Sequence, residues 1–164
     1  MAPEICNRND MAGFSRFVEE NPSMLEERDE ETVLHLATQL GYEALAKKII
    51  ELSPSLVSST NSKGETPLHF AASLGHTSIL IMMLKSETQD DEKLAEMMNK
   101  EGLTPLHCAA MKGSVEILRE FLDKAPSSFN SVTLEKETVF HIAARNKKNE
   151  AFIFMAKSAN FCTS

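Results

Sequence analysis

One short motif is written four times along the chain at nearly constant spacing. It reads TVLHLATQLG from Thr32, TPLHFAASLG from Thr66, TPLHCAAMKG from Thr104 and TVFHIAARNK from Thr138. The threonines stand at 32, 66, 104 and 138, which gives steps of 34, 38 and 34 residues. A period of this size is typical of a solenoid, in which each repeat cannot bury its own apolar face and stacks on its neighbours.

Each copy of the motif carries the signals of a short helix. Threonine caps a helix start, and proline, present at Pro67 and Pro105, suits the first helical position. A glycine nine residues after the threonine closes the helix in three copies, whereas the fourth has Lys147, where we expect a strained ending of roughly 1 kcal/mol. A second helix is then predicted from apolar residues at helical spacing: Leu45, Ala46, Ile49 and Ile50; Ile79, Leu80, Met83 and Leu84; Ile117, Leu118, Phe121 and Leu122.

The repeats divide the chain into one domain over residues 1–164. We expect a partial first repeat at about 1–29, because Phe14, Phe17, Val18 and Pro22 match the end of a repeat, and full repeats at about 30–63, 64–101, 102–135 and 136–164. Turn-forming connectors, TNSKGE and NKEGL, separate the helix pairs. The longer step of 38 residues places about one extra helical turn within 85–101, so either the second helix is longer or a short acidic helix is added.

The stretch TPLHFAASLGH resembles the signature of the ankyrin repeat family, whose period is about 33 residues. The connector SPSLVSSTNSKGETPLH resembles those of plant membrane-associated ankyrin proteins of the accelerated-cell-death type. The resemblance implies an all-α ankyrin-repeat solenoid of stacked antiparallel helix pairs with short β-hairpin or turn connectors. It also implies a scaffold or adaptor without catalysis that binds a protein partner through a concave surface. The alternative is a cytosolic regulatory region of a plant membrane protein in defence or stress signalling, truncated before its transmembrane part.

Composition narrows the function classes. The formal charge of −7 disfavours nucleic acid as a partner, and the three cysteines form no C-x-x-C pair, which fits free thiols in a reducing compartment. The longest apolar run, ILIMML at 79–84, is far shorter than the roughly 20 residues that span a bilayer, so we expect no direct membrane insertion. We therefore predict a cytoplasmic location, or the cytosolic face of a membrane if the chain is part of a longer protein.

No residue grouping indicates a catalytic, cofactor or metal site. The motif histidines lie one to a repeat, and stacked helices are about 8–10 Å apart, too far for the histidines to share one zinc ion. Cys108 stands where the other copies have Leu36, Phe70 and Ile142, so it is predicted to be a core residue, and Asp90, Asp91 and Glu92 are predicted to be solvated. The resemblance implies a structural role for the motif pairs: Thr32 with His35, Thr66 with His69, Thr104 with His107, and Thr138 with His141.

Partner binding is assigned to positions that vary between repeats. By the resemblance, the hairpin fingertips and the ends of the first helices line the concave face. The predicted partner-binding residues are Glu31, Gln39, Leu40, Lys63, Glu65, Ser73, Leu74, Lys100, Glu101, Leu103, Met111, Lys112, Glu135, Glu137 and Arg145.

Two apolar surfaces raise separate questions. Ile81 and Met82 take the place of charged residues in other copies, and we expect the inserted segment 87–98 to cover them. The last helix, NEAFIFMAKSANF, spreads Phe152, Ile153, Phe154, Met155 and Phe161 too widely for one face to bury them all. The chain is therefore predicted either to be a fragment of a longer ankyrin protein or to self-associate through its C-terminal repeat, with Phe154→Glu making it more monomeric.

Overall fold

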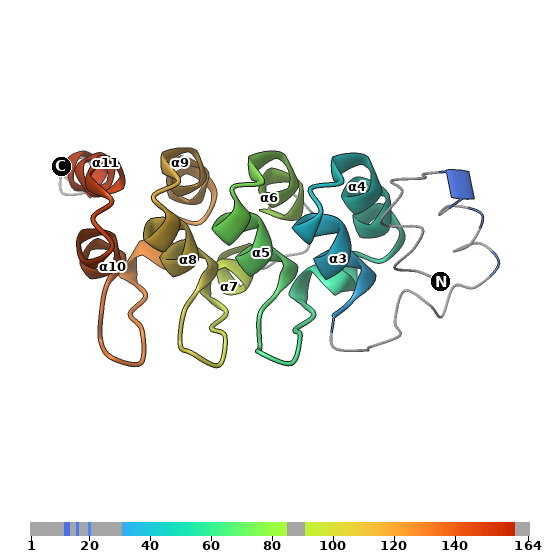
Figure 1. Cartoon of the computed structure of the whole chain (residues 1–164), viewed down its shortest axis with the longest axis horizontal. Coiled ribbons are helices and arrows are strands. Elements are labelled where there is room, and N and C mark those ends of the chain that lie inside the picture. The colour runs from blue at the N-terminus through green and yellow to red at the C-terminus, as the bar shows by residue number, and fades with distance from the viewer. Residues whose placement is uncertain (1–11, 14–15, 17–19, 21–30, 85–90, 160–164) are drawn as a thin grey trace.

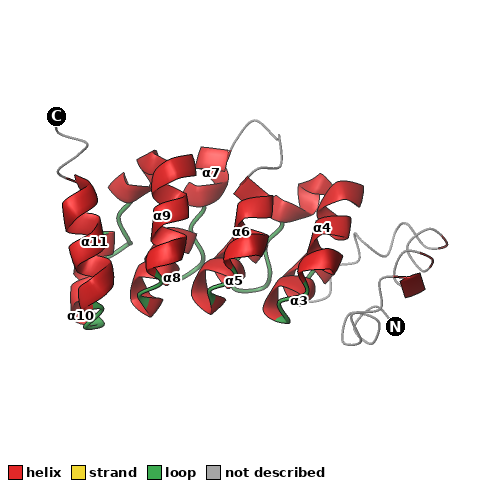
Figure 2. Cartoon of the chain, turned by 90° about the horizontal axis from the view of Figure 1, so that it is seen from above, coloured by secondary structure: helices red, strands yellow, loops and turns green. Residues whose placement is uncertain are grey.

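The computed structural model describes residues 12–13, 16, 20, 31–84 and 91–159. In these residues the chain forms a row of antiparallel helix pairs, which Figure 1 shows side on and Figure 2 from above. The first helices are α3 (Val33–Gln39), α5 (Pro67–Leu74), α8 (Pro105–Lys112) and α10 (Val139–Arg145), and the second helices are α4 (Glu43–Leu52), α6 (Thr77–Leu84), α9 (Val115–Lys124) and α11 (Asn149–Ala159). The predicted all-α solenoid is confirmed. The partial first repeat, Cys6, Asp90, Phe161 and Cys162 lie outside the described residues.

The motif sets the bounds of the first helices. Thr32, Thr66 and Thr104 have extended backbone, and each side chain accepts the N–H of the histidine three residues later at 3.4 Å. At the other end Gly75 and Gly113 adopt φ of 79° and 80°, which closes the helix. Lys147 takes the same left-handed conformation with φ of 56°, as the sequence predicted for the residue that replaces glycine.

The core is continuous from pair to pair. Leu34, Leu68 and Leu106 of the first helices are fully buried, as are Ile49 and Met83 of the second helices. Each inner pair contacts the pair before it and the pair after it, α5 with α3 and α8, and α6 with α4 and α9. Stability therefore comes from stacking between repeats as well as from packing within each pair.

Short helices follow the second helices. The 3₁₀ helices η2 (Pro54–Ser58) and η3 (Pro126–Asn130) follow α4 and α9, and each begins at a proline. The inserted segment forms the short acidic helix α7 (Asp91–Glu96), one of the two predicted outcomes. Its main contacts are with α8, α9 and η3, so it packs on the following repeat. The expected cover over Ile81 and Met82 stays a prediction, and both residues are half-buried.

Turns connect one helix pair to the next and extend from the same side of the row (Figure 1). We call residues 61–65, 99–103 and 133–137 the finger turns. Asn61 Oδ1 accepts the N–H groups of Lys63 and Glu65 at 2.9 Å, and Asn99 Oδ1 accepts those of Glu101 and Leu103 at 3.0 Å. The described residues contain no β-strand, so the connectors are turns.

Candidate interaction surface

The first two motif histidines join their repeat to the next. In the second helix pair, the backbone N–H of Thr66 donates to His69 Nδ1 at 3.1 Å, while His69 Nε2 lies 3.0 Å from the carbonyl oxygen of Leu103 in the next finger turn. His35 repeats the arrangement, with its Nε2 2.8 Å from the carbonyl oxygen of Glu65. These two imidazoles therefore cap their own helix and hold the following finger turn.

The last two histidines depart from this pattern. His107 is fully buried and pairs with Thr104, but its Nε2 has no hydrogen-bond partner. The carbonyls of Ser131 and Glu137 lie near the ring and oppose the lowering of its pKa by burial, without reaching hydrogen-bonding geometry. His141 is exposed, although the Thr138 N–H still donates to its Nδ1 at 3.2 Å. The predicted Thr–His pairs thus form in all four copies, while the bond to the next finger turn forms in the first two.

Cys108 is a core residue. It is buried, and burial raises the pKa of its thiol to about 12. A thiol of that pKa is protonated at neutral pH and supplies no thiolate nucleophile.

Asp91 differs from expectation, because it is half-buried at the start of α7 and burial raises the pKa of its carboxyl. Within the described residues no group of three or more His, Cys, Asp or Glu side chains is placed to hold a metal ion.

The predicted partner-binding residues lie in two groups, one on the finger turns with Glu31 and one at the ends of the first helices. Leu40 and Leu74 are 38% and 51% exposed, so two of these positions present an apolar side chain to solvent. The other exposed members are Glu31, Gln39, Lys63, Lys100, Glu101, Glu135, Lys112 and Arg145, and the half-buried members are Glu65, Ser73, Leu103, Met111 and Glu137.

Some of these residues also have partners within the chain. Arg145 forms an ion pair with Glu137, Nη1 to Oε2 at 2.9 Å, and Asn61 donates to the Glu65 carboxylate at 3.1 Å. Leu103 and Met111 pack against the core. Neighbouring finger turns are linked by a backbone bond from Lys100 N–H to the Lys63 carbonyl oxygen at 2.9 Å. The exposed members are therefore better placed than the half-buried ones to meet a partner.

The sequence analysis missed the conformation of Lys136. It has φ of 64°, at the place in its finger turn where Gly64 and Gly102 have φ of 74° and 76°. Aligning the turns NSKGE, NKEGL and TLEKE would have revealed it. At Gly102 a larger residue is also excluded by lack of space, because a Cβ there would meet the side chain of Leu134. Leu134 lies in the next finger turn and is 69% exposed.

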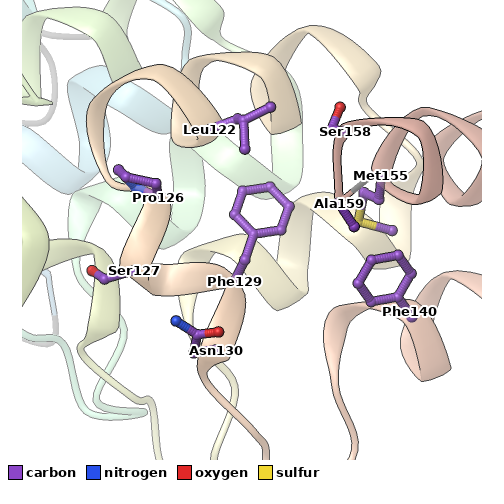
Figure 3. A pocket seen from close by; sticks show the side chains of 9 residues that line it. All are labelled: Leu122, Pro126, Ser127, Phe129, Asn130, Phe140, Met155, Ser158 and Ala159. Atoms are coloured by element: carbon purple, nitrogen blue, oxygen red, sulfur yellow. The ribbon is translucent and has the colours of Figure 1, made fainter. Parts of the chain in front are cut away.

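A groove lies between the third and fourth repeats, with a volume of about 370 Å³. Figure 3 shows its walls, which come from the end of α9, η3, α10 and α11 and are mostly apolar; they include Leu122, Phe129, Phe140 and Met155. Phe140 stands where the other repeats have fully buried leucines, yet it is only half-buried. The joint between these repeats is therefore incompletely filled at this side.

No helix among the described residues has both the length and the apolar character needed to cross a membrane.

The family model described as "Ankyrin repeats (3 copies)" matches residues 5–94 and 88–163. A curated relative, Protein ACCELERATED CELL DEATH 6 of Arabidopsis thaliana, is 38% identical over 58 residues. That match covers 35% of this chain and 9% of the relative, so the chain spans a small part of that protein's length. Ankyrin repeats are in general non-catalytic protein-interaction modules. From the four-fold motif, the stacked helix pairs and the matching family model, the chain belongs to the ankyrin-repeat family.

Proposed function

We propose that this chain is a non-catalytic scaffold or adaptor that binds a protein partner through the finger turns and the ends of the first helices. One observation carries the proposal: the positions that vary between repeats are largely exposed, whereas the motif positions of the inner repeats are buried. The fold therefore uses its constant residues for stacking and leaves the variable ones for recognition. The single domain over 1–164, with the repeat bounds given above, is part of this proposal.

The chemistry of the surface changes along the row. The first two repeats expose Leu40 and Leu74, and the third has Lys112 at the corresponding position. The finger turns expose residues of both charges, Lys63, Lys100 and Lys136 together with Glu101 and Glu135. Such a surface fits a partner with an apolar anchor for the leucines and an acidic group for Lys112, since interfaces combine an apolar centre with a polar rim.

The test compares two triple variants with similar changes in composition. The surface variant carries Leu74→Ser, Lys63→Glu and Lys112→Glu, and the control carries Leu52→Ser, Lys47→Glu and Lys157→Glu on the second helices, where all three residues are exposed. A partner captured with the wild-type chain is titrated against each variant, and circular dichroism checks the fold. The surface variant should lose about tenfold or more in affinity, because a residue central to an interface contributes more than about 1 kcal/mol.

The control should bind like the wild-type chain. Equal affinity of all three proteins would place the interface elsewhere, and a loss confined to the control would assign it to the second helices. If both triple variants lose affinity, a chain that carries both sets of changes shows whether they disrupt one shared interface or two separate ones.

The similarity to the Arabidopsis relative supports a second candidate function, a cytosolic regulatory region of a plant membrane protein in defence or stress signalling. The location is then the cytosolic face of a membrane, and otherwise the cytoplasm. The full transcript provides the test: an apolar segment of about 20 residues in the same reading frame supports this candidate. A complete frame without such a segment, together with recovery of the chain in the cytosolic fraction, contradicts it.

A further inference from the structure

One position at the end of the first helices changes its chemistry along the row. It holds Leu40, Leu74 and Lys112 in the first three repeats, where all three side chains are exposed. In the fourth repeat the equivalent residue is Asn146, and Lys147 follows it. The turns that come directly after these residues lie along one edge of the row in Figure 2. We call Leu40, Leu74, Lys112 and Lys147 the edge strip.

The basic end of the edge strip has no counterion within the described part of the chain. Lys147 is exposed, and Lys148 lies with its stem over Gly113, where an added Cβ would be 2.9 Å from the Lys148 Cδ. Gly113 directly follows Lys112, so the third and fourth repeats bring three lysines to one stretch of this edge. None of the three forms an ion pair with a described residue.

Two acidic residues near this end do not neutralise the lysines. Glu116 and Glu150 lie close to Gly113, each in the first turn of a second helix, α9 and α11. Negative charge is favourable there because a helix N-terminus is positive. Neither forms an ion pair with a described lysine. The rest of the net charge of −7 is largely screened beyond about 8 Å at physiological salt, so the lysines present a local positive charge.

The spacing of the edge strip favours an extended ligand over a helical one. Stacked helices lie about 8–10 Å apart, so the strip offers one anchor at roughly this interval. An extended chain advances about 3.3 Å per residue, which places every third residue on an anchor. A helix advances about 1.5 Å per residue, so residues three apart cover only about half the interval and also point in different directions.

We propose that the edge strip binds an extended segment of a partner protein that carries two apolar and then two acidic residues at three-residue intervals. The apolar residues cover Leu40 and Leu74, and removing these side chains from water favours binding. The acidic residues pair with Lys112 and with Lys147, which fixes the register of the segment. This inference rests on the proposed function, because it names the chemistry of the partner for part of the same surface.

Fluorescence anisotropy with labelled peptides and the full chain tests the proposal. The probe is a twelve-residue peptide of serine and glutamine with leucine at its second and fifth positions and glutamate at its eighth and eleventh. A second probe has the reversed sequence, since the spacing fits either chain direction. One of the two should bind about tenfold more tightly than a peptide of the same composition whose four anchors stand two residues apart, because that spacing aligns fewer anchors with the strip.

A charge exchange then identifies the contact. Lys112→Glu should weaken binding of the probe about three- to tenfold, since attraction at an exposed pair becomes repulsion. A probe with lysine in place of the glutamate nearer the leucines should recover the lost affinity for this variant. Lys47→Glu, on the exposed side of α4, is the matched control and should bind the original probe like the wild-type chain. Circular dichroism checks that each variant is folded.

Three results would overturn the proposal. The first is that neither probe binds more tightly than the peptide with the shorter spacing. The second is a loss that is equal in Lys112→Glu and Lys47→Glu, or that the exchanged probe does not reverse. The third is binding to vesicles that contain phosphatidylserine, abolished by Lys112→Glu, when neither probe binds; the lysines then contact a lipid surface.

The outcome is separable from that of the proposed function. If a captured partner needs Leu74 and Lys112 while neither probe binds, the interaction surface stands and the extended segment is rejected. If the surface variant leaves a captured partner unaffected, the proposed function fails for that partner, whatever the probes do.

Discussion

At the residue scale, the inner histidines are held in one protonation state. The N–H of Thr66 donates to His69 Nδ1, so that nitrogen carries no proton and Nε2–H donates to the Leu103 carbonyl. Burial is the largest cause that lowers the pKa of His35, His69 and His107, and the backbone carbonyls near their rings oppose it. A second proton would have to replace the bond from the threonine N–H. These imidazoles are therefore neutral structural groups.

Stability should consequently fall in mild acid. The unfolded histidines titrate near their ordinary pKa of 6.5 and the folded ones below it, so the unfolded state takes up protons first as pH falls. The stabilisation is complete above pH 6.5 and decreases below it, by up to about 1.4 kcal/mol per pH unit for each histidine. Urea unfolding at a series of pH values between about 7.5 and 5.5 measures this slope.

His69→Gln is the matched control for that slope. Glutamine at the third helical position can still accept the threonine N–H, as in the usual capping box, but it does not titrate. The variant should therefore show a shallower fall of stability with acid than the wild-type chain. An identical slope in the two proteins would assign the pH dependence to other groups.

Two lysines should limit stability through their backbone. Lys136 and Lys147 have φ of 64° and 56°, where a side chain costs roughly 1–2 kcal/mol that glycine does not incur. Because glycine also loses more entropy on folding, Lys147→Gly should gain a net of up to about 1 kcal/mol in thermal or urea unfolding. Lys47→Gly, within α4, should instead lose about 1 kcal/mol. A loss at both sites would show that the Lys147 backbone is not strained.

At the scale of elements, the histidines should differ in what they contribute. His69→Ala removes the helix cap and the bond to the next finger turn, whereas His107→Ala removes the cap alone, because His107 Nε2 has no partner. Both variants should melt at a lower temperature than the wild-type chain. The free energy of unfolding should be lower for His69→Ala than for His107→Ala by about 0.5–1.5 kcal/mol, the net value of one hydrogen bond. Equal losses in the two variants would mean that the bond to the next finger turn contributes nothing measurable.

Sequence reasoning predicted the main helices because their signals are local. Threonine, proline and glycine bound the first helices, and apolar spacing identified the second. The 3₁₀ helices were missed, since Pro54 and Pro126 show only that a helix has ended, while burial of Leu56 and Val57 depends on neighbouring helices. The same limit applies to the candidate surface. The exposure of Leu74 followed from its variability, but the packing of Leu103 and Met111 against the core is a tertiary contact that the local sequence does not reveal.

At the scale of the whole molecule, several features that reduce stability lie between the third and fourth repeats or within the fourth repeat. Between the third and fourth repeats lie the groove of about 370 Å³, the unpaired His107 Nε2 and the half-buried Phe140. Lys136 and Lys147, both in left-handed backbone, belong to the fourth repeat itself. Between the second and third repeats, by contrast, His69 bonds to Leu103 and the finger turns share a backbone hydrogen bond. In a solenoid, stability is approximately the sum of such repeat and joint contributions, so it should be uneven along the row.

The fourth repeat should therefore open before the rest of the molecule. In native-state hydrogen exchange, the amides of α10 and α11 should exchange with a lower opening free energy than those of α5 and α8. Lys147→Gly should raise the protection of α10 and α11 while leaving α5 unchanged, because it relieves strain in the fourth repeat alone. If α10 and α11 instead share the opening free energy of α5 in both proteins, the row unfolds as one cooperative unit. In that case the weaker joint between the third and fourth repeats does not lower the opening free energy of the fourth repeat enough for it to unfold separately.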